Sequence, residues 1–167
     1  MKVIKIFTIS THSFRIHPTI CEILDDRDGS TFTWPSAEVL SAFLLSSREV
    51  IQLAGKRVIE LGAGTGLPSI VCGLCGAALV RITDRKDERE LYNVVQESIT
   101  LNHLHNVCRV EEMDWDSPHD KIGHVDIILG SDVFYNPEDF VKVFRIVHAF
   151  MEVNHACVFL TSYQQRK

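Results

Sequence analysis

The chain has 167 residues, 46% of them hydrophobic and 23% charged, and its formal net charge at pH 7 is −5. This length and composition predict one globular domain and argue against intrinsic disorder. The negative net charge argues against direct nucleic-acid binding, which depends on a basic surface, and is compatible with a basic protein substrate.

The N-terminal sequence and the cysteine content favour a cytoplasmic or nuclear protein. The segment MKVIKIFTIS has no long apolar core and no small-residue cleavage site, and no run approaches the roughly 20 apolar residues of a membrane span. Five cysteines, an odd number without the spacing of a disulfide framework, are expected to be reduced thiols. We therefore expect no membrane contact.

The first 30 residues are predicted to form an extension of strands. Apolar residues partly alternate over 3–9 and 14–24, which indicates two short strands that meet in a hairpin around 11–13. A turn cluster follows at 25–30. A helix is then predicted over Pro35–Ser47, with its inner face made by Ala37, Leu40, Phe43 and Leu44.

Strands and helices alternate along the remainder of the chain. The predicted strands are 57–61, 79–83, 107–111, 125–129 and 157–161, and the predicted helices are 68–75, 88–102 and 137–151. The residues expected to face inward from the last two helices are Leu91, Val94, Val95, Ser98, Ile99, Phe140, Val143, Phe144 and Val147. This order predicts an α/β, Rossmann-like, doubly wound and mostly parallel sheet over residues 31–167.

The segment VIELGAGTGLPSI, at 58–70, carries the main functional signal. Gly62, Gly64 and Gly66 follow a buried strand and precede a helix, where glycine lets a ligand approach the main chain. Leu67 replaces the third glycine of a dinucleotide fingerprint, which disfavours a nicotinamide enzyme. The acidic Glu60 before the turn suits the ammonium and sulfonium of S-adenosylmethionine (SAM). The alternative is a glycine turn that binds nothing.

Acidic and aromatic residues follow the next two strands. Asp84 comes about 20 residues after the glycine turn, the spacing at which a carboxylate accepts hydrogen bonds from ribose hydroxyls. Its alternative role is to cap the next helix. Asp114 is expected to accept the adenine amino group and Trp115 to cover an adenine face, unless Trp115 is an aromatic residue at the edge of the core.

The segment GSDVFYNPEDF, at 130–140, follows the fourth strand of the predicted sheet. Ligands of open α/β sheets lie beyond the carboxyl ends of the strands, so Asp132 and Tyr135 are expected to flank the place where methyl donor and acceptor meet. We expect Asp132 to orient the acceptor nitrogen and Tyr135 to form a wall. The alternative for Asp132 is a capping or loop residue.

Together these segments resemble the class-I, seven-strand methyltransferases of the lysine methyltransferase-like family 16. The resemblance covers about residues 12–166 and rests on the glycine segment, Asp84 in ITDRK, the D-x-x-[YF] signature at 132–135, and the Trp-Pro element at 32–44. It implies SAM as cofactor. The residues that it places at the cofactor are Trp34, Gly62, Ala63, Gly64, Asp84, Trp115 and Ser131.

The resemblance also implies a function. The family mostly methylates lysines of specific proteins, and the branch most similar to this sequence is linked to histone arginine methylation. We therefore expect a SAM-dependent protein N-methyltransferase that acts on lysine or arginine of a protein substrate, with a histone among the candidates. The double-glutamate loop of the main arginine methyltransferase class is not visible, because Asp132, Glu138 and Asp139 are the acidic residues of the segment 130–140 that follows the fourth strand.

Two other readings stay open. The family continues past the fifth strand into a helix and an antiparallel strand pair, which this sequence is expected to lack, so an inactive SAM-fold protein that acts as a binding module is the main alternative. A small-molecule methyltransferase is the other. No metal site is expected, since Cys72 and Cys75 lie on an apolar helix and His103 and His105 lack partners at ligand spacing.

Overall fold

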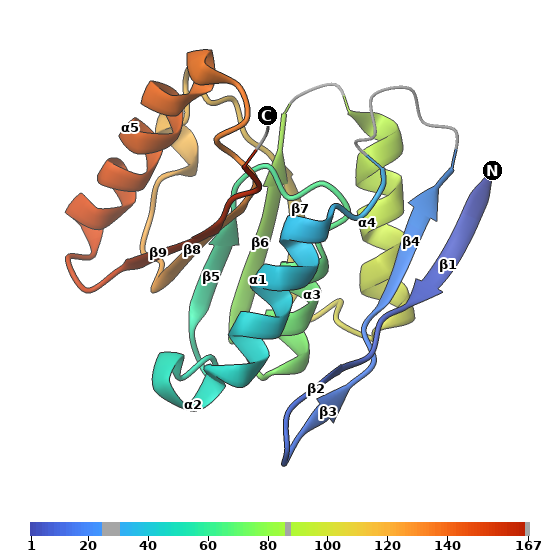
Figure 1. Ribbon diagram of the computed structural model, residues 1–167. Helices are drawn as coiled ribbons and strands as arrows, with labels where there is room; N and C mark the ends of the chain where they lie inside the picture. Colours follow the sequence, from blue (N-terminus) through green and yellow to red (C-terminus); the bar gives the residue numbers. More distant parts are fainter. Residues whose placement is uncertain (25–30, 86–87, 166–167) are drawn as a thin grey trace.

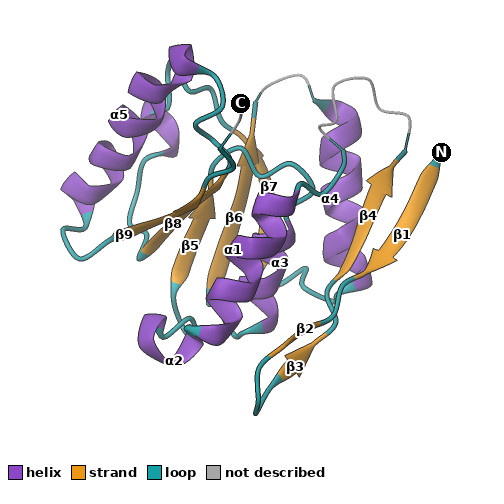
Figure 2. Ribbon diagram, viewed as in Figure 1, coloured by secondary structure: helices purple, strands orange, loops and turns teal. Residues whose placement is uncertain are grey.

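The computed structural model describes residues 1–24, 31–85 and 88–165. At its centre lies a parallel sheet of five strands in the order β7-β6-β5-β8-β9 (Figures 1 and 2). These strands are β5 (Arg57–Glu60), β6 (Leu79–Asp84), β7 (Cys108–Glu112), β8 (Ile127–Ser131) and β9 (Val158–Ser162). The predicted α/β class and the parallel sheet are confirmed.

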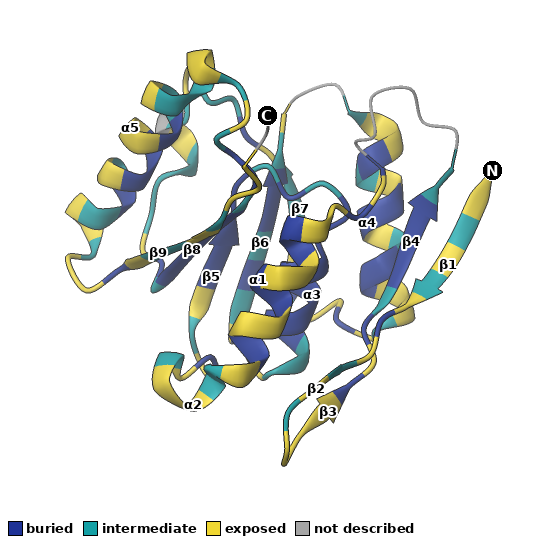
Figure 3. Ribbon diagram, in the orientation of Figure 1, coloured by how far each residue is buried: buried dark blue, intermediate teal, exposed yellow. Residues whose placement is uncertain are grey.

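Helices cover both faces of this sheet. They are α1 (Pro35–Ser46), α2 (Arg48–Ile51), α3 (Leu67–Leu74), α4 (Arg89–Leu101) and α5 (Pro137–Val153), with a short 3₁₀ turn at His119–Lys121. Because side chains alternate along a strand, Val58 packs with α1, α3 and α4, whereas its neighbour Ile59 packs with α5. Figure 1 shows α5 on the opposite side of the sheet from α1 and α3, and Figure 3 shows the buried inner faces.

The N-terminal strands form a separate antiparallel ribbon. Strand β1 (Lys2–Ile6) pairs with β4 (Thr19–Ile23), and β2 (Ile9–Ser10) pairs with β3 (Arg15–Ile16). The predicted hairpin is therefore confirmed, and its turn is closed by the Thr11 nitrogen, which donates to the Phe14 oxygen at 2.7 Å. The predicted turn at 25–30 lies outside the described residues.

Side chains of α4 attach this ribbon to the rest of the molecule. The Cys21 nitrogen donates to Oγ of Ser98 at 2.9 Å, and the Asn102 side chain bonds both the nitrogen and the oxygen of Thr19. Strand β4 and helix α4 lie side by side in Figure 1. The ribbon thereby satisfies backbone groups that a free strand edge would expose.

Some predicted details are wrong. Strand β8 runs to Ser131 because Gly130 and Ser131 pair with β9. Phe43 and Phe144 face solvent instead of the core, and Phe140 is half-buried. On α5 the Phe144 and Phe140 rings instead lie against Phe134, with centroids 5.2 and 5.4 Å away. The inward residues predicted for α4 are all buried, as expected.

In the described part of the chain, no helix has the length and apolar character needed to cross a membrane.

Candidate functional site

The glycine turn joins the end of β5 to the start of α3. Gly62, Gly64 and Gly66 have φ angles of +58°, +52° and +75°, a left-handed backbone conformation that residues other than glycine rarely adopt. The turn is held by the Ala63 nitrogen, which donates to the Thr83 oxygen at 3.0 Å. Glycine at all three positions lets the backbone pass from strand to helix without the strain that another residue would carry there.

Asp84 is bonded directly to this turn. At the end of β6, its Oδ2 accepts a hydrogen bond from the Gly64 nitrogen at 2.8 Å, and its Oδ1 accepts one from the Arg85 nitrogen at 2.8 Å. Helix α4 begins only at Arg89, with Glu88 in its N-cap position, so Asp84 does not cap it. The acid predicted to hold ribose thus borders the glycine turn.

Trp115 lies over the other side of the turn. A β-carbon at Gly62 would lie 3.3 Å from Cζ2 of Trp115 and 3.3 Å from Cγ1 of Val133, so a larger residue would press on both side chains. The indole Nε1 of Trp115 is buried and has no hydrogen-bond partner within the described residues. Its neighbour Asp114 turns the loop, because its Oδ1 accepts from the Asp116 nitrogen at 3.0 Å.

Glu60 lies at the end of β5 and is fully buried. Its Oε2 accepts two hydrogen bonds from Ser69 on α3, from the backbone nitrogen at 3.1 Å and from Oγ at 2.5 Å. Burial, assisted by the nearby negative charge of Asp84, raises the pKa of Glu60 to about 8. Glu60, the acidic residue predicted to border the cofactor, is therefore hydrogen-bonded to α3.

Asp132 and Tyr135 follow the end of β8, next to Ser131. Asp132 is 7% exposed and has a φ of +56°, a strained conformation for a residue other than glycine. Its nitrogen donates to the Ser162 oxygen on β9 at 2.8 Å, which holds that conformation. Tyr135 is 49% exposed, and Asn136 after it caps α5 by accepting from the Glu138 nitrogen.

Trp34 occupies the N-cap position of α1. Its ring is 44% exposed and meets Phe32 edge to face, with ring centroids 6.2 Å apart. Hydroxyl groups of the adjacent Thr33 and of Thr65 in the glycine turn lie 2.8 Å apart and are buried. The segment of Trp34 is thereby attached to the turn, although the two are far apart in the sequence.

The predicted site residues thus gather at one edge of the sheet. Apart from Trp34, which precedes α1, they lie at or just beyond the carboxyl ends of β5, β6, β7 and β8, where ligands of such sheets bind (Figure 1). Sequence reasoning missed Thr33, Thr65, Ser69 and Ser162. Their roles depend on contacts between distant segments, so no local pattern marks them.

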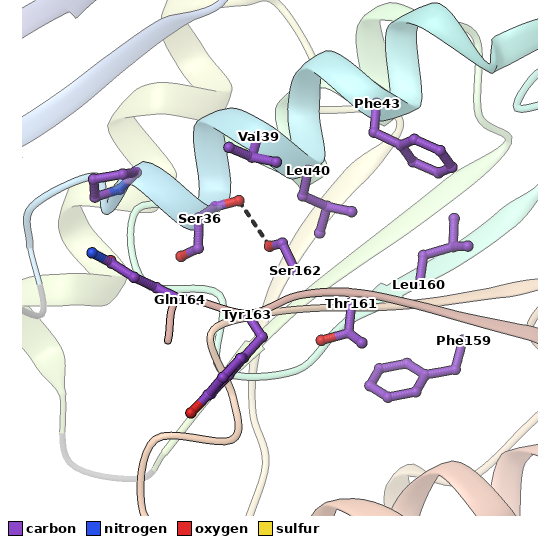
Figure 4. Close-up of a pocket in the computed structure, with 11 residues that line it drawn as sticks. Ser36, Val39, Leu40, Phe43, Phe159, Leu160, Thr161, Ser162, Tyr163 and Gln164 are labelled. Atoms are coloured by element: carbon purple, nitrogen blue, oxygen red, sulfur yellow. Dashed lines mark hydrogen bonds between the residues drawn. The ribbon is translucent and has the colours of Figure 1, made fainter. Parts of the chain in front are cut away.

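A groove of about 710 Å³ lies beside this edge, between α1 and β9. Apolar side chains from Val39, Phe43, Phe159 and Tyr163 line it, and Figure 4 shows them with Ser162, whose Oγ donates to the Ser36 oxygen at 2.8 Å. Its lining does not include the glycine turn. Within described residues, no group of three His, Cys, Asp or Glu side chains is placed to hold a metal ion.

Comparison with known proteins gives one family and several relatives. A family model described as lysine methyltransferase matches residues 19–167. The histone-arginine methyltransferase METTL23 of Rattus norvegicus is 35% identical over 145 residues, which cover 81% of this chain and 60% of the relative. The protein N-lysine methyltransferase METTL21A of Danio rerio is 38% identical over 137 residues, covering 80% and 59%.

A solved structure shares the fold. A putative SAM-dependent methyltransferase from Streptococcus mutans superposes with a TM-score of 0.59 at 19% identity and covers 89% of this chain and 38% of that one. This likeness confirms the Rossmann-like sheet. The chain spans about 60% of the length of the two relatives above.

Proposed function

The chain belongs to the lysine methyltransferase family, and we propose from this that it is a SAM-dependent N-methyltransferase of protein side chains. The observation that supports this most directly is the bond between Asp84 and Gly64. This bond joins the glycine turn, which exposes its main chain, to Asp84, whose carboxylate can accept hydrogen bonds from two hydroxyl groups. We expect residues 31–167 to form the catalytic domain and 1–30 its strand extension.

The cofactor residues that we propose surround this unit. Asp84 would bind the ribose hydroxyls, Gly62, Ala63 and Gly64 would offer main chain, and Trp115 and Asp114 would hold the adenine. Glu60, Trp34 and Ser131 would border the methionine end, where Glu60 supplies the negative charge that suits an ammonium group. SAM, when bound, supplies a methyl group already activated by its sulfonium. The Nε1 of Trp115, which has no hydrogen-bond partner among the described residues, supports a polar ligand beside it.

The acceptor residues are proposed at the end of β8. Asp132 is buried and its backbone is fixed by Ser162, so its carboxylate is positioned before any substrate arrives. It would accept a hydrogen bond from the acceptor nitrogen and orient its lone pair toward the methyl group. The exposed Tyr135 would form one wall for the substrate side chain.

The substrate proposed is a protein with a basic target residue. Relatives named for lysine and for histone-arginine methylation both match this chain, and its net charge of −5 suits a basic partner such as a histone. Because a histone substrate would be found in the nucleus or, before its import, in the cytoplasm, we propose a cytoplasmic or nuclear location. We propose that the protein contacts neither nucleic acid nor a membrane directly.

Calorimetric titration of S-adenosylhomocysteine tests the cofactor site. We expect micromolar binding by the wild type and its loss in Asp84→Ala, whereas Glu49→Ala, an exposed acid in α2, should bind as the wild type does. If S-adenosylhomocysteine binds, mass spectrometry of lysine and arginine peptides then tests methyl transfer. A folded wild-type protein that binds nothing would contradict the proposal and support the binding-module alternative.

A further inference from the structure

Glu60 differs from an ordinary cofactor ligand because its two carboxylate oxygens have different surroundings. Oε2 accepts from both the nitrogen and the hydroxyl of Ser69. Oε1 is closed to solvent and has no hydrogen-bond partner among the residues that the structure describes. A buried polar oxygen without a partner is costly, so its presence beside a ligand site requires an explanation.

Ser69 makes the contact that fixes this asymmetry. It is fully buried in the first turn of α3, where the N-cap residue Gly66 has no side chain to accept from the helix nitrogens. The carboxylate of Glu60 takes that place from the neighbouring strand. Glu60 therefore joins β5 to α3 behind the glycine turn.

The charges around Glu60 favour its neutral form in the free protein. The titratable groups beside it are Asp84 at the end of β6 and the Cys72 thiol on α3, and β8 places the apolar Leu129 opposite. Among the residues that the structure describes, no cation contributes to the pKa of this acid. The positive charge of the cofactor's methionine end is the partner that the proposed function would bring to it.

We propose that Glu60 carries a proton in the free protein and loses it when the cofactor's ammonium group binds, with Ser69 as the positioning residue that holds the resulting carboxylate. This inference rests on the proposed SAM site. The O–H bond of the carboxyl breaks, its electron pair stays on the carboxylate, and the proton passes to solvent. Cofactor binding then strengthens as pH rises, approaching tenfold per unit below pH 8.

Calorimetry in two buffers of different ionisation heat measures the released proton. With S-adenosylhomocysteine at pH 7 we expect close to one proton released by the wild type. With 5′-methylthioadenosine, which lacks the amino-acid end, we expect none. The isosteric Glu60→Gln variant is the matched control, because any proton exchange by the ligand's own amine remains in it while that of Glu60 does not.

Ser69→Ala tests the positioning role. It keeps the backbone bond to Glu60 and removes the hydroxyl bond, so the affinity for S-adenosylhomocysteine should fall about tenfold at pH 7 and recover at higher pH. Affinity for 5′-methylthioadenosine should stay unchanged, and Ser69→Thr should restore the wild-type pH profile. A purely structural role would weaken both ligands equally and would contradict the inference.

The outcomes separate the two proposals. A folded wild type that binds neither ligand overturns the proposed function and this inference with it. A wild type that binds S-adenosylhomocysteine but releases no more protons than Glu60→Gln, or than it does with 5′-methylthioadenosine, overturns the inference alone. Should Ser69→Ala fail to fold, the comparison of two ligands on the wild type still decides.

Discussion

The backbone nitrogen of Gly64 lies 2.8 Å from Oδ2 of Asp84. This contact joins the connections that follow two neighbouring strands, β5 and β6, which pair in parallel register. A ligand that touches the glycine turn therefore also meets the acid. A substitution at either residue should therefore affect the position of the other. Variants of the acid and of the turn can then show how much cofactor affinity depends on the carboxylate charge and how much on the backbone conformation.

Asp84→Asn should weaken S-adenosylhomocysteine about ten- to a hundredfold and leave the fold intact. The amide oxygen can still accept from Gly64, but an NH₂ group replaces the oxygen that accepts from the Arg85 nitrogen and that ribose needs as a second acceptor. Asp84→Ala should weaken binding further because it also leaves the Gly64 nitrogen unpaired. Calorimetry measures both. Glu112→Gln, at the exposed end of β7, is the control and should bind normally.

Gly62→Ala should lose stability and at least tenfold in cofactor affinity. Its left-handed φ costs an alanine about 1–2 kcal/mol, and the new β-carbon would press on Trp115 at 3.3 Å. Gly55→Ala has the same backbone strain at φ +77° with nothing within 4 Å. It should lose similar stability in urea unfolding but keep its affinity. Equal affinity in the two variants would argue against a crowded turn at the cofactor.

Asp132→Asn should bind S-adenosylhomocysteine normally and lose about a hundredfold in methyl transfer. Asparagine tolerates the φ of +56°, so the backbone stays in place while the negative charge is lost. Glu138→Gln changes a nearby exposed carboxylate in α5 and should keep full activity. Peptide methylation followed by mass spectrometry decides. Full activity in Asp132→Asn would remove this residue from the acceptor site.

Glu60→Gln should flatten the pH dependence of stability. Because burial raises the pKa of Glu60 from 4.5 to about 8, the folded protein holds a proton that the unfolded chain has released between these values. Unfolding free energy of the wild type should therefore fall as pH rises through that window, by up to about 1.4 kcal/mol per unit. Urea midpoints at pH 5 to 8 test this. Parallel curves for wild type and variant would contradict it.

The alternation of strands and helices and the position of the glycine turn were accessible from the sequence because each depends on neighbouring residues. Strand alternation placed Asp84 at a strand end, and the three glycines predicted a turn between strand and helix, where the structure gives them left-handed φ angles. Burial was predictable where a helix has one clear apolar stripe, as in α4. It failed at Phe43 and Phe144, where more apolar residues are available than one face of the helix can bury.

Contacts between distant segments were not accessible in the same way. The pairs Thr33–Thr65 and Glu60–Ser69 are made by polar side chains with no fixed spacing in the sequence, and they form only once α1 and α3 pack on β5. The left-handed Asp132 is equally hidden, because the Ser162 oxygen that holds it belongs to another strand. Local sequence patterns predict individual helices and strands, whereas the packing of those elements decides which polar groups form hydrogen bonds.

Ser162 couples the outer strand of the sheet to the acceptor site. Its oxygen holds the strained backbone of Asp132, and its hydroxyl holds the Ser36 oxygen in the first turn of α1, beside Trp34. Within the described chain, β9 is an edge of the sheet and has one pairing partner, β8. A strand that pairs along this edge would shift or steady β9 and thereby Asp132 and Trp34 together. Turnover would then respond to what pairs with β9.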